Sequence, residues 1–216
     1  ATMCLSMGGG IGVNYSGLRP SGSPISRMGG KSSGPLALMQ MINEVARHVM
    51  AGGARRSALW AGLHWKHPDI EEFIKIKDWN DDVQNMKAKH FEAPAPLDMT
   101  NISVIIDDEY LQKLGYDSST QDLHHRICES MARTGEPAFR NQSRILLDDP
   151  TGITGNPCQE STLGNRSCCN LGSIVLPRIQ NLSHLEEITR LATQFLINGS
   201  IKAHYPTPEI AAQAHA

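Results

Sequence analysis

Short apolar segments alternate with segments of helical periodicity along this 216-residue chain, and this alternation constrains the fold more than any other feature. Strand-length apolar runs separated by helical segments are typical of parallel strands joined by crossover helices. The sequence therefore predicts an α/β protein with a parallel sheet. The predicted strands cover residues 11–15, 57–63, 101–106 and 169–176.

The helical segments have start and stop signals. Pro35 suits the first position of a helix, and the pair Gly52–Gly53 would end that helix. Ser183 and Glu186 have the S-x-x-E spacing of a capping box, which predicts the start of the last long helix. Two further helices are predicted over residues 69–77 and 119–134, and the C-terminal segment contains the start of another. On the last long helix, a buried stripe is predicted from Leu185, Ile188, Ala192 and Phe195.

Composition excludes several classes of protein. The formal net charge of -2 provides no basic surface for nucleic acid or an anionic membrane. No apolar run approaches the roughly 20 residues that span a bilayer, and the start of the chain lacks the pattern of a signal peptide. The five cysteines contain no C-x-x-C pair, which argues against a disulfide framework and a structural zinc site. We therefore expect a cytoplasmic protein with no nucleic-acid or membrane partner and no metal site.

Residues 155–160 read GNPCQE and combine three chemically useful side chains. If the segment is extended, Asn156, Cys158 and Glu160 face one side, roughly 6.6 Å apart per step. The flanking residues favour loops, so we place the three at a loop tip. The carboxylate can accept a proton, the amide can orient hydroxyl groups, and the thiol can act as a nucleophile or form a radical. The alternative is a loop with incidental polar residues.

A second cysteine element, Cys168 and Cys169, follows about ten residues later. Adjacent strand residues face opposite sides, so at most one of the two thiols should approach the space around Cys158. Ordinary core packing is the alternative for this pair.

Six motifs in order resemble the catalytic subunit of ribonucleotide reductase, most closely its adenosylcobalamin-dependent class. The resemblance runs from about residue 8 to the C-terminus. It implies a partial ten-stranded α/β barrel with a central finger loop, and an internal fragment of the catalytic barrel domain over residues 1–216. The motifs are GGGIGVNYSGLRPSGSPI, GGARRSA, HPDIEEFI, GEPAFRN, NPCQE and CCNLGSI.

The resemblance implies roles for the cysteine elements. Cys158 would become a thiyl radical and abstract the ribose 3'-hydrogen. Glu160 would take the proton of the 3'-hydroxyl, and Asn156 would hold the ribose hydroxyls. Cys169 would be one thiol of the redox-active pair, whereas Cys168 would pack. The finger loop and the redox-cysteine strand would occupy residues 150–172. Because the second thiol of the family's pair has no match, we expect the chain alone to be inactive.

The resemblance also implies an effector region over residues 26–58. Gly52, Gly53, Arg55 and Arg56 would form a mobile specificity loop, in which Arg55 senses the effector base, and residues 26–34 match a second effector loop. Solvated loop charges are the alternative for the two arginines. The helix over 35–50 would help to form a homodimer interface, although an apolar helix can equally lie in a monomer core.

The implied function is reduction of ribonucleotides to deoxyribonucleotides for DNA synthesis, by an oxidoreductase with a disulfide as acceptor. The implied partners are a ribonucleotide substrate, a deoxynucleotide effector, a thioredoxin-like reductant and adenosylcobalamin as cofactor. The first alternative is a non-catalytic nucleotide-binding module that uses GGGIG and GGARRS for phosphate while its cysteines pack. The second is a glycyl-radical or metal-radical relative with a similar barrel.

Overall fold

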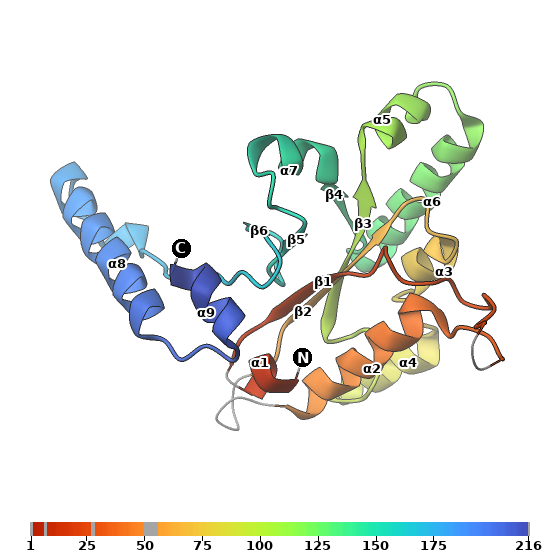
Figure 1. Cartoon of the computed structure of the whole chain (residues 1–216), viewed down its shortest axis with the longest axis horizontal. Coiled ribbons are helices and arrows are strands. Elements are labelled where there is room, and N and C mark those ends of the chain that lie inside the picture. Colours follow the sequence, from red (N-terminus) through yellow and green to blue (C-terminus); the bar gives the residue numbers. More distant parts are fainter. Residues whose placement is uncertain (1, 7, 27–28, 50–55, 216) are drawn as a thin grey trace. The chain divides into compact units, whose positions relative to one another are not determined.

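The computed structural model describes residues 2–6, 8–26, 29–49 and 56–215, and the chain divides into two compact units after Gly164 (Figure 1). The first unit is built around a four-stranded sheet whose strands are all parallel and follow the chain order β1-β2-β3-β4. This confirms the predicted α/β class and the strands near residues 11–15, 57–63 and 101–106. The strands are β1 (Ile11–Asn14), β2 (Leu59–His64), β3 (Thr100–Ile106) and β4 (Ala138–Asn141).

The register of the sheet aligns the starts of its first three strands. Ile11 is paired with Leu59, and Leu59 with Thr100, whereas β4 joins further along β3, where Ser103 is paired with Ala138. The described residues form four parallel strands of the implied ten-stranded barrel. Closure into ten strands stays a prediction.

Helices connect the strands, and side-chain caps begin most of them. The side chain of Asp117 accepts a hydrogen bond from the backbone N–H of Thr120 at the start of α6, and Gly135, with φ of 80°, ends that helix. The predicted helices near 35–50, 69–77 and 119–134 are confirmed. The helices of the first unit are α1 (Thr2–Ser6), α2 (Gly34–His48), α3 (Ile70–Lys75), α4 (Asp81–Lys89), α5 (Asp108–Leu114), α6 (Ser118–Thr134) and α7 (Gln142–Asp148).

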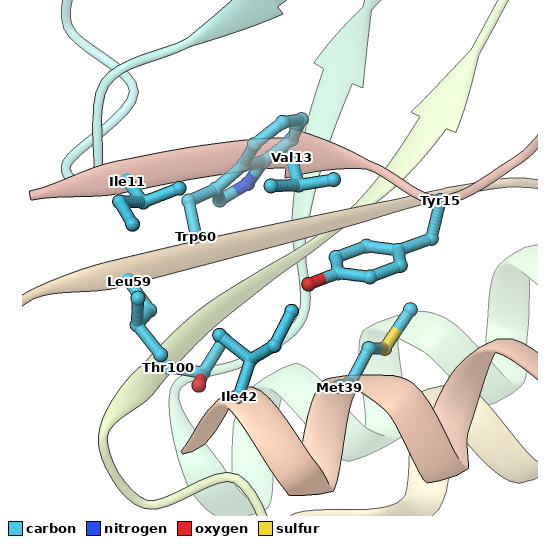
Figure 2. A pocket seen from close by; sticks show the side chains of 8 residues that line it. All are labelled: Ile11, Val13, Tyr15, Met39, Ile42, Leu59, Trp60 and Thr100. Atoms are coloured by element: carbon cyan, nitrogen blue, oxygen red, sulfur yellow. The ribbon is translucent and has the colours of Figure 1, made fainter. Parts of the chain in front are cut away.

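The core lies between one face of the sheet and the helices. Side chains alternate between the two faces of a strand, so Ala61 and Leu63 of β2 lie on the same face as Ile102 and Val104 of β3. All four pack in one buried cluster with residues of α2, α3, α5 and α6. Figure 2 shows part of this face, where Met39 and other α2 side chains point toward β1 and β2 around a small apolar cavity.

The second unit corrects three predictions. Residues 169–175 form no strand, because a strand needs a partner for its backbone groups and the described residues of this unit provide none. The long helix begins after Asn181, whose side chain accepts from the N–H of His184, so Ser183 is not its cap. Phe195 is 78% exposed rather than buried. The unit contains the 3-10 turn η1 (Leu176–Arg178), α8 (Leu182–Lys202) and α9 (Pro208–His215). The last of these, α9, is the helix predicted in the C-terminal segment.

Within the described residues, no helix combines the length and the apolar character that crossing a bilayer requires.

Candidate functional site

The GNPCQE segment forms the tip of a short antiparallel hairpin, which confirms that it lies on a loop. The hairpin consists of β5 (Thr154–Gly155) and β6 (Thr162–Leu163), joined by residues 156–161. The segment is not extended, so the condition under which the three side chains would face one side is not met. Pro157 and Cys158 form a turn, and Gln159 has a left-handed backbone with φ of 68°. The alternation of faces expected for an extended strand therefore does not apply.

This turn gives the three predicted catalytic side chains different surroundings. Asn156 is buried, and its Oδ1 accepts a hydrogen bond from the N–H of Ser161 at 3.1 Å. The backbone carbonyl of Asn156 accepts from the N–H of Gln159 at 3.1 Å. The side chains of Cys158 and Glu160 are exposed. The structure thus brings the three residues onto one loop, where the side chain of Asn156 is buried with its Oδ1 bonded within the loop, whereas those of Cys158 and Glu160 are exposed.

The hairpin lies on the sheet face of Gly12, opposite the face that packs against α2, α3, α5 and α6, and glycines allow the contact. The hydroxyl of Thr154 donates to the carbonyl oxygen of Gly12 at 3.1 Å. A Cβ on Gly12 would lie 1.8 Å from the carbonyl oxygen of Gly155, and one on Gly10 would lie 2.3 Å from Cγ of Pro157. These two glycines of GGGIG therefore make room for the hairpin. This packing explains the two glycines without the phosphate-binding role that the nucleotide-module alternative gave them.

Two residues that the sequence analysis did not single out fix the hairpin to the sheet. Nδ2 of Asn101, at the start of β3, donates to the carbonyl oxygen of Pro157 at 2.8 Å. Arg140 of β4 is buried and donates to the side chain of Gln159 at 2.7 Å and to the carbonyl oxygen of Thr154 at 2.7 Å. The only sequence signal for Arg140 is its place in the motif GEPAFRN. Nothing in that motif predicts a contact with residues 156–161.

The second cysteine element lies in the second unit, in a segment without regular structure. Cys168 is exposed and Cys169 is half-buried. No disulfide joins any of the five cysteines, all of which lie in the described part of the chain. The expectation that alternating strand faces separate the two thiols does not apply, because the strand is not formed.

The predicted effector loop is only partly described. Gly52, Gly53 and Arg55 lie outside the described residues. Arg56 forms an ion pair with Glu92, and its guanidinium lies 4.4 Å from the ring centroid of Phe91. Arg56 is therefore paired with the loop that precedes β3, but its side chain is 46% exposed, so the alternative of a solvated loop charge stays open.

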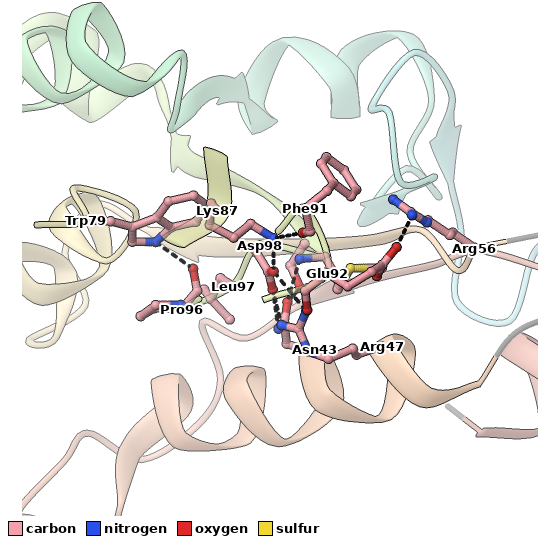
Figure 3. A network of polar contacts seen from close by, with 12 residues as sticks. Asn43, Arg47, Arg56, Trp79, Lys87, Phe91, Glu92, Pro96, Leu97 and Asp98 are labelled. Carbon is pink, nitrogen blue, oxygen red and sulfur yellow. Dashed lines mark hydrogen bonds and ion pairs between the residues drawn. The ribbon is translucent and has the colours of Figure 1, made fainter. Parts of the chain in front are cut away.

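A buried carboxylate lies near this arginine (Figure 3). The side chain of Asp98 is 1% exposed and accepts from Arg47 of α2, from Lys87 of α4 at 2.8 Å and from Asn43 at 3.1 Å. Burial alone would raise the pKa of Asp98, but these hydrogen bonds outweigh it and hold the pKa below its usual value. Asn43 also accepts from the N–H of Met99 at 2.9 Å. The network thus ties α2 and α4 to the start of β3.

Among the described residues, no group of three or more His, Cys, Asp or Glu side chains is arranged to hold a metal ion. A cobalamin does not need such a group, because its corrin ring supplies four of the cobalt ligands. Two cavities near the ends of β1 and β2 have volumes of about 260 and 340 Å³, which is the size that encloses a drug-sized ligand rather than a corrinoid. No step of the chemistry can be assigned to such a cofactor from these residues.

Comparison with protein families identifies the chain. A family model described as "Ribonucleotide reductase, barrel domain" matches residues 1–118 and 106–216. The chain belongs to this family. The family match confirms the resemblance drawn from the six motifs and shows that the chain is part of a ribonucleotide reductase catalytic subunit.

Individual relatives agree with this assignment. The chain is 30% identical to a vitamin B12-dependent ribonucleoside-diphosphate reductase of Mycobacterium tuberculosis, over 97% of this chain and 32% of the relative. It is 28% identical to the enzyme of the same description from Thermoplasma acidophilum, over 94% of this chain and 28% of the relative. It is 24% identical to ribonucleoside-diphosphate reductase large chain 2 of Saccharomyces cerevisiae, over 93% of this chain and 29% of the relative. The chain therefore spans about a third of the length of these curated relatives.

A solved structure shows the same fold. The class Id ribonucleotide reductase alpha subunit of Actinobacillus ureae superposes with a TM-score of 0.64, covering 99% of this chain and 40% of that chain. At 15% sequence identity this likeness concerns the fold alone.

Proposed function

We propose that this chain carries the radical-forming cysteine of a ribonucleotide reductase, and that this cysteine is Cys158. The supporting observation is the position of its thiol, which is exposed at the tip of a hairpin fixed to a parallel sheet in a member of the reductase barrel family. A hydrogen-atom transfer requires the thiol and the ribose to be held in contact. A thiol on a loop anchored at both flanks meets that requirement.

The residues around the thiol have distinct tasks. As a thiyl radical, Cys158 takes the 3'-hydrogen atom of the ribose and becomes a thiol again. Glu160, whose carboxylate is exposed on the same loop, accepts the proton of the 3'-hydroxyl, and the 2'-hydroxyl takes up a proton from the redox-active thiol pair and leaves as water. Asn156 orients the ribose hydroxyls with its amide group while its Oδ1 keeps the loop closed. Cys169 is one thiol of the pair that reduces the 2'-carbon and ends as a disulfide.

The other partners follow from the same proposal. The substrate is a ribonucleotide, the product is a deoxyribonucleotide for DNA synthesis in the cytoplasm, and a thioredoxin-like protein restores the dithiol. Adenosylcobalamin is the proposed radical source, because several of the relatives are vitamin B12-dependent reductases. Residues 26–58 form the effector region. Within it Arg55 senses the effector base, and Gly52, Gly53 and Arg56 flank it. The chain associates as a homodimer.

The test compares cysteine variants of the intact gene product. Deoxyribonucleotide formation is measured with a ribonucleotide, adenosylcobalamin and a dithiol for the wild type, Cys158→Ser and Cys128→Ser. Cys128 is a matched control because it is a partly exposed thiol on α6, away from the hairpin. We expect Cys158→Ser to abolish product formation and Cys128→Ser to retain it. Product formation by Cys158→Ser at the wild-type rate would remove Cys158 from this role.

A further inference from the structure

We infer that Arg140 is a positioning residue for the finger loop: its buried guanidinium holds the loop through Gln159 and thereby sets the place of the Cys158 thiol. The geometric part of this inference stands on contacts alone, and its catalytic part rests on the proposed function.

Arg140 binds the hairpin on both sides of the tip. On the side that leads to the tip, Nη2 donates to the carbonyl oxygens of Gly152 at 3.2 Å and Thr154 at 2.7 Å. On the side that follows Cys158, Nη1 donates to Oε1 of Gln159 at 2.7 Å. The planar guanidinium offers donors in fixed directions, so one side chain can fix both flanks.

The contact continues from Gln159 across the tip. Nε2 of Gln159 donates to the carbonyl oxygen of Asn156 at 2.6 Å, so Cys158 lies between two residues held by one network. Space for this network depends on Gly155, where a Cβ would lie 2.8 Å from Nε2 of Gln159 and 2.9 Å from Nη1 of Arg140. The loop is therefore closed around an arginine rather than around an apolar side chain.

The charge of Arg140 has no carboxylate partner among the described residues. Its remaining hydrogen bond runs from Nε to Oε1 of Gln142 at 3.2 Å, and its guanidinium lies 5.4 Å from the ring centroid of Trp60. Arg140 is 4% exposed, and burial lowers its pKa. A buried cation without a counter-charge is costly, and an apolar residue would serve packing better. An arginine is present because its guanidinium donates hydrogen bonds to both flanks of the hairpin tip, which an apolar side chain cannot do.

Hydrogen exchange on the chain tests the positioning role without any turnover. Methionine replaces the arginine with an apolar side chain of similar length, and Arg144→Met is the matched control, because the side chain of Arg144 is 69% exposed on the neighbouring α7. In Arg140→Met we expect the amides of Asn156, Gln159 and Ser161, which are hydrogen-bonded within the loop, to exchange at least about tenfold faster, while those of β2 and β3 keep their protection. Unchanged exchange at residues 156–161 would overturn the inference.

A second variant keeps the inference testable if the first one unfolds. If Arg140→Met fails to fold, Gln159→Ala removes the side chain that links the guanidinium to the tip while Arg140 keeps its contacts to Gly152 and Thr154. The same local increase in exchange is expected from Gln159→Ala, and its absence would again overturn the inference.

Kinetics of the intact gene product separate positioning from substrate binding. Misplacing a reacting group by about 1 Å costs on the order of 100-fold in rate. We therefore expect Arg140→Met and Arg140→Lys to lower kcat by about that factor with little change in KM, and Arg144→Met to leave both unchanged. A rise in KM with unchanged kcat would contradict a positioning role. If Cys158→Ser retains activity, the proposed function fails, whereas the exchange result for Arg140 stands.

Discussion

Gly12 of β1 and Gly155 of β5 approach so closely that a methyl group on Gly12 would lie 1.8 Å from the carbonyl oxygen of Gly155. The two residues are 143 positions apart in the chain, as their numbers show (155 − 12), and their contact fixes the hairpin to the sheet. The absence of a side chain on Gly12 therefore sets how closely the hairpin with Cys158 packs on the sheet.

Gly12→Ala should displace the hairpin. The added methyl group cannot be accommodated without backbone movement, and overpacking of this kind costs about 1–3 kcal/mol. Urea unfolding should show this loss of stability, and exchange of the amides at 154–156 and 158–163 should increase. Gly17→Ala is the matched control, because a Cβ at Gly17 meets nothing within 4 Å. Equal stability of the two variants would show that the close contact is absent in solution.

Asp98→Asn should destabilise the first unit at neutral pH. The substitution leaves the charges of Arg47 and Lys87 without their shared buried partner, and removing one partner of such a pair costs about 3 kcal/mol. Denaturant unfolding at pH 7 measures the loss. Asp148→Asn, at an exposed ion pair with Arg144, should cost less than about 1 kcal/mol.

The pKa of Asp98 also predicts a dependence of stability on pH. Because its pKa in the folded chain is lowered, Asp98 contributes stability above the unfolded value of about 3.9, and this contribution is lost as pH falls through the folded value. The free energy of unfolding of the wild type should therefore decrease below about pH 4 more steeply than that of Asp98→Asn. Parallel pH profiles of the two proteins would show that Asp98 is not held in its charged form.

Arg55→Ala should weaken the effect of deoxynucleotide effectors on substrate choice in the intact gene product. The proposed role of Arg55 is to sense the effector base, so its loss should change the ratio of products from competing ribonucleotides more than the total rate. Arg144→Ala is the control, because Arg144 lies on α7 and is paired with Asp148. An unchanged product ratio for Arg55→Ala would exclude this role.

The apolar strands of the sheet were predictable from sequence, whereas the fourth was not. β2 and β3 are buried apolar runs, and β1 is a short, partly buried one. β4 consists of only Ala138–Asn141 and ends in Arg140 and Asn141, so its composition resembles a loop. Its place in the sheet comes from pairing with β3, which a local pattern does not contain.

The candidate site was predictable in its residues but not in its geometry. The composition of GNPCQE indicates a loop with a thiol, an amide and a carboxylate, and the structure has that loop. Gln159 has a left-handed backbone, and its side chain is held by Arg140, a buried residue 19 positions earlier in the chain. Tertiary contacts of this kind decide which side chains face a ligand, and period-two alternation in an extended strand cannot represent them.

The fate of the ribose 3'-hydrogen tests the role of Cys158 most directly. The intact gene product is incubated with a ribonucleotide carrying tritium at the 3'-carbon, together with adenosylcobalamin and a dithiol, and tritium in water is counted. A hydrogen atom transferred to sulfur can exchange with solvent, so the wild type and Cys128→Ser should release tritium, whereas Cys158→Ser should release none above the background without enzyme. Release by Cys158→Ser at the wild-type rate would contradict the assignment of the radical to Cys158.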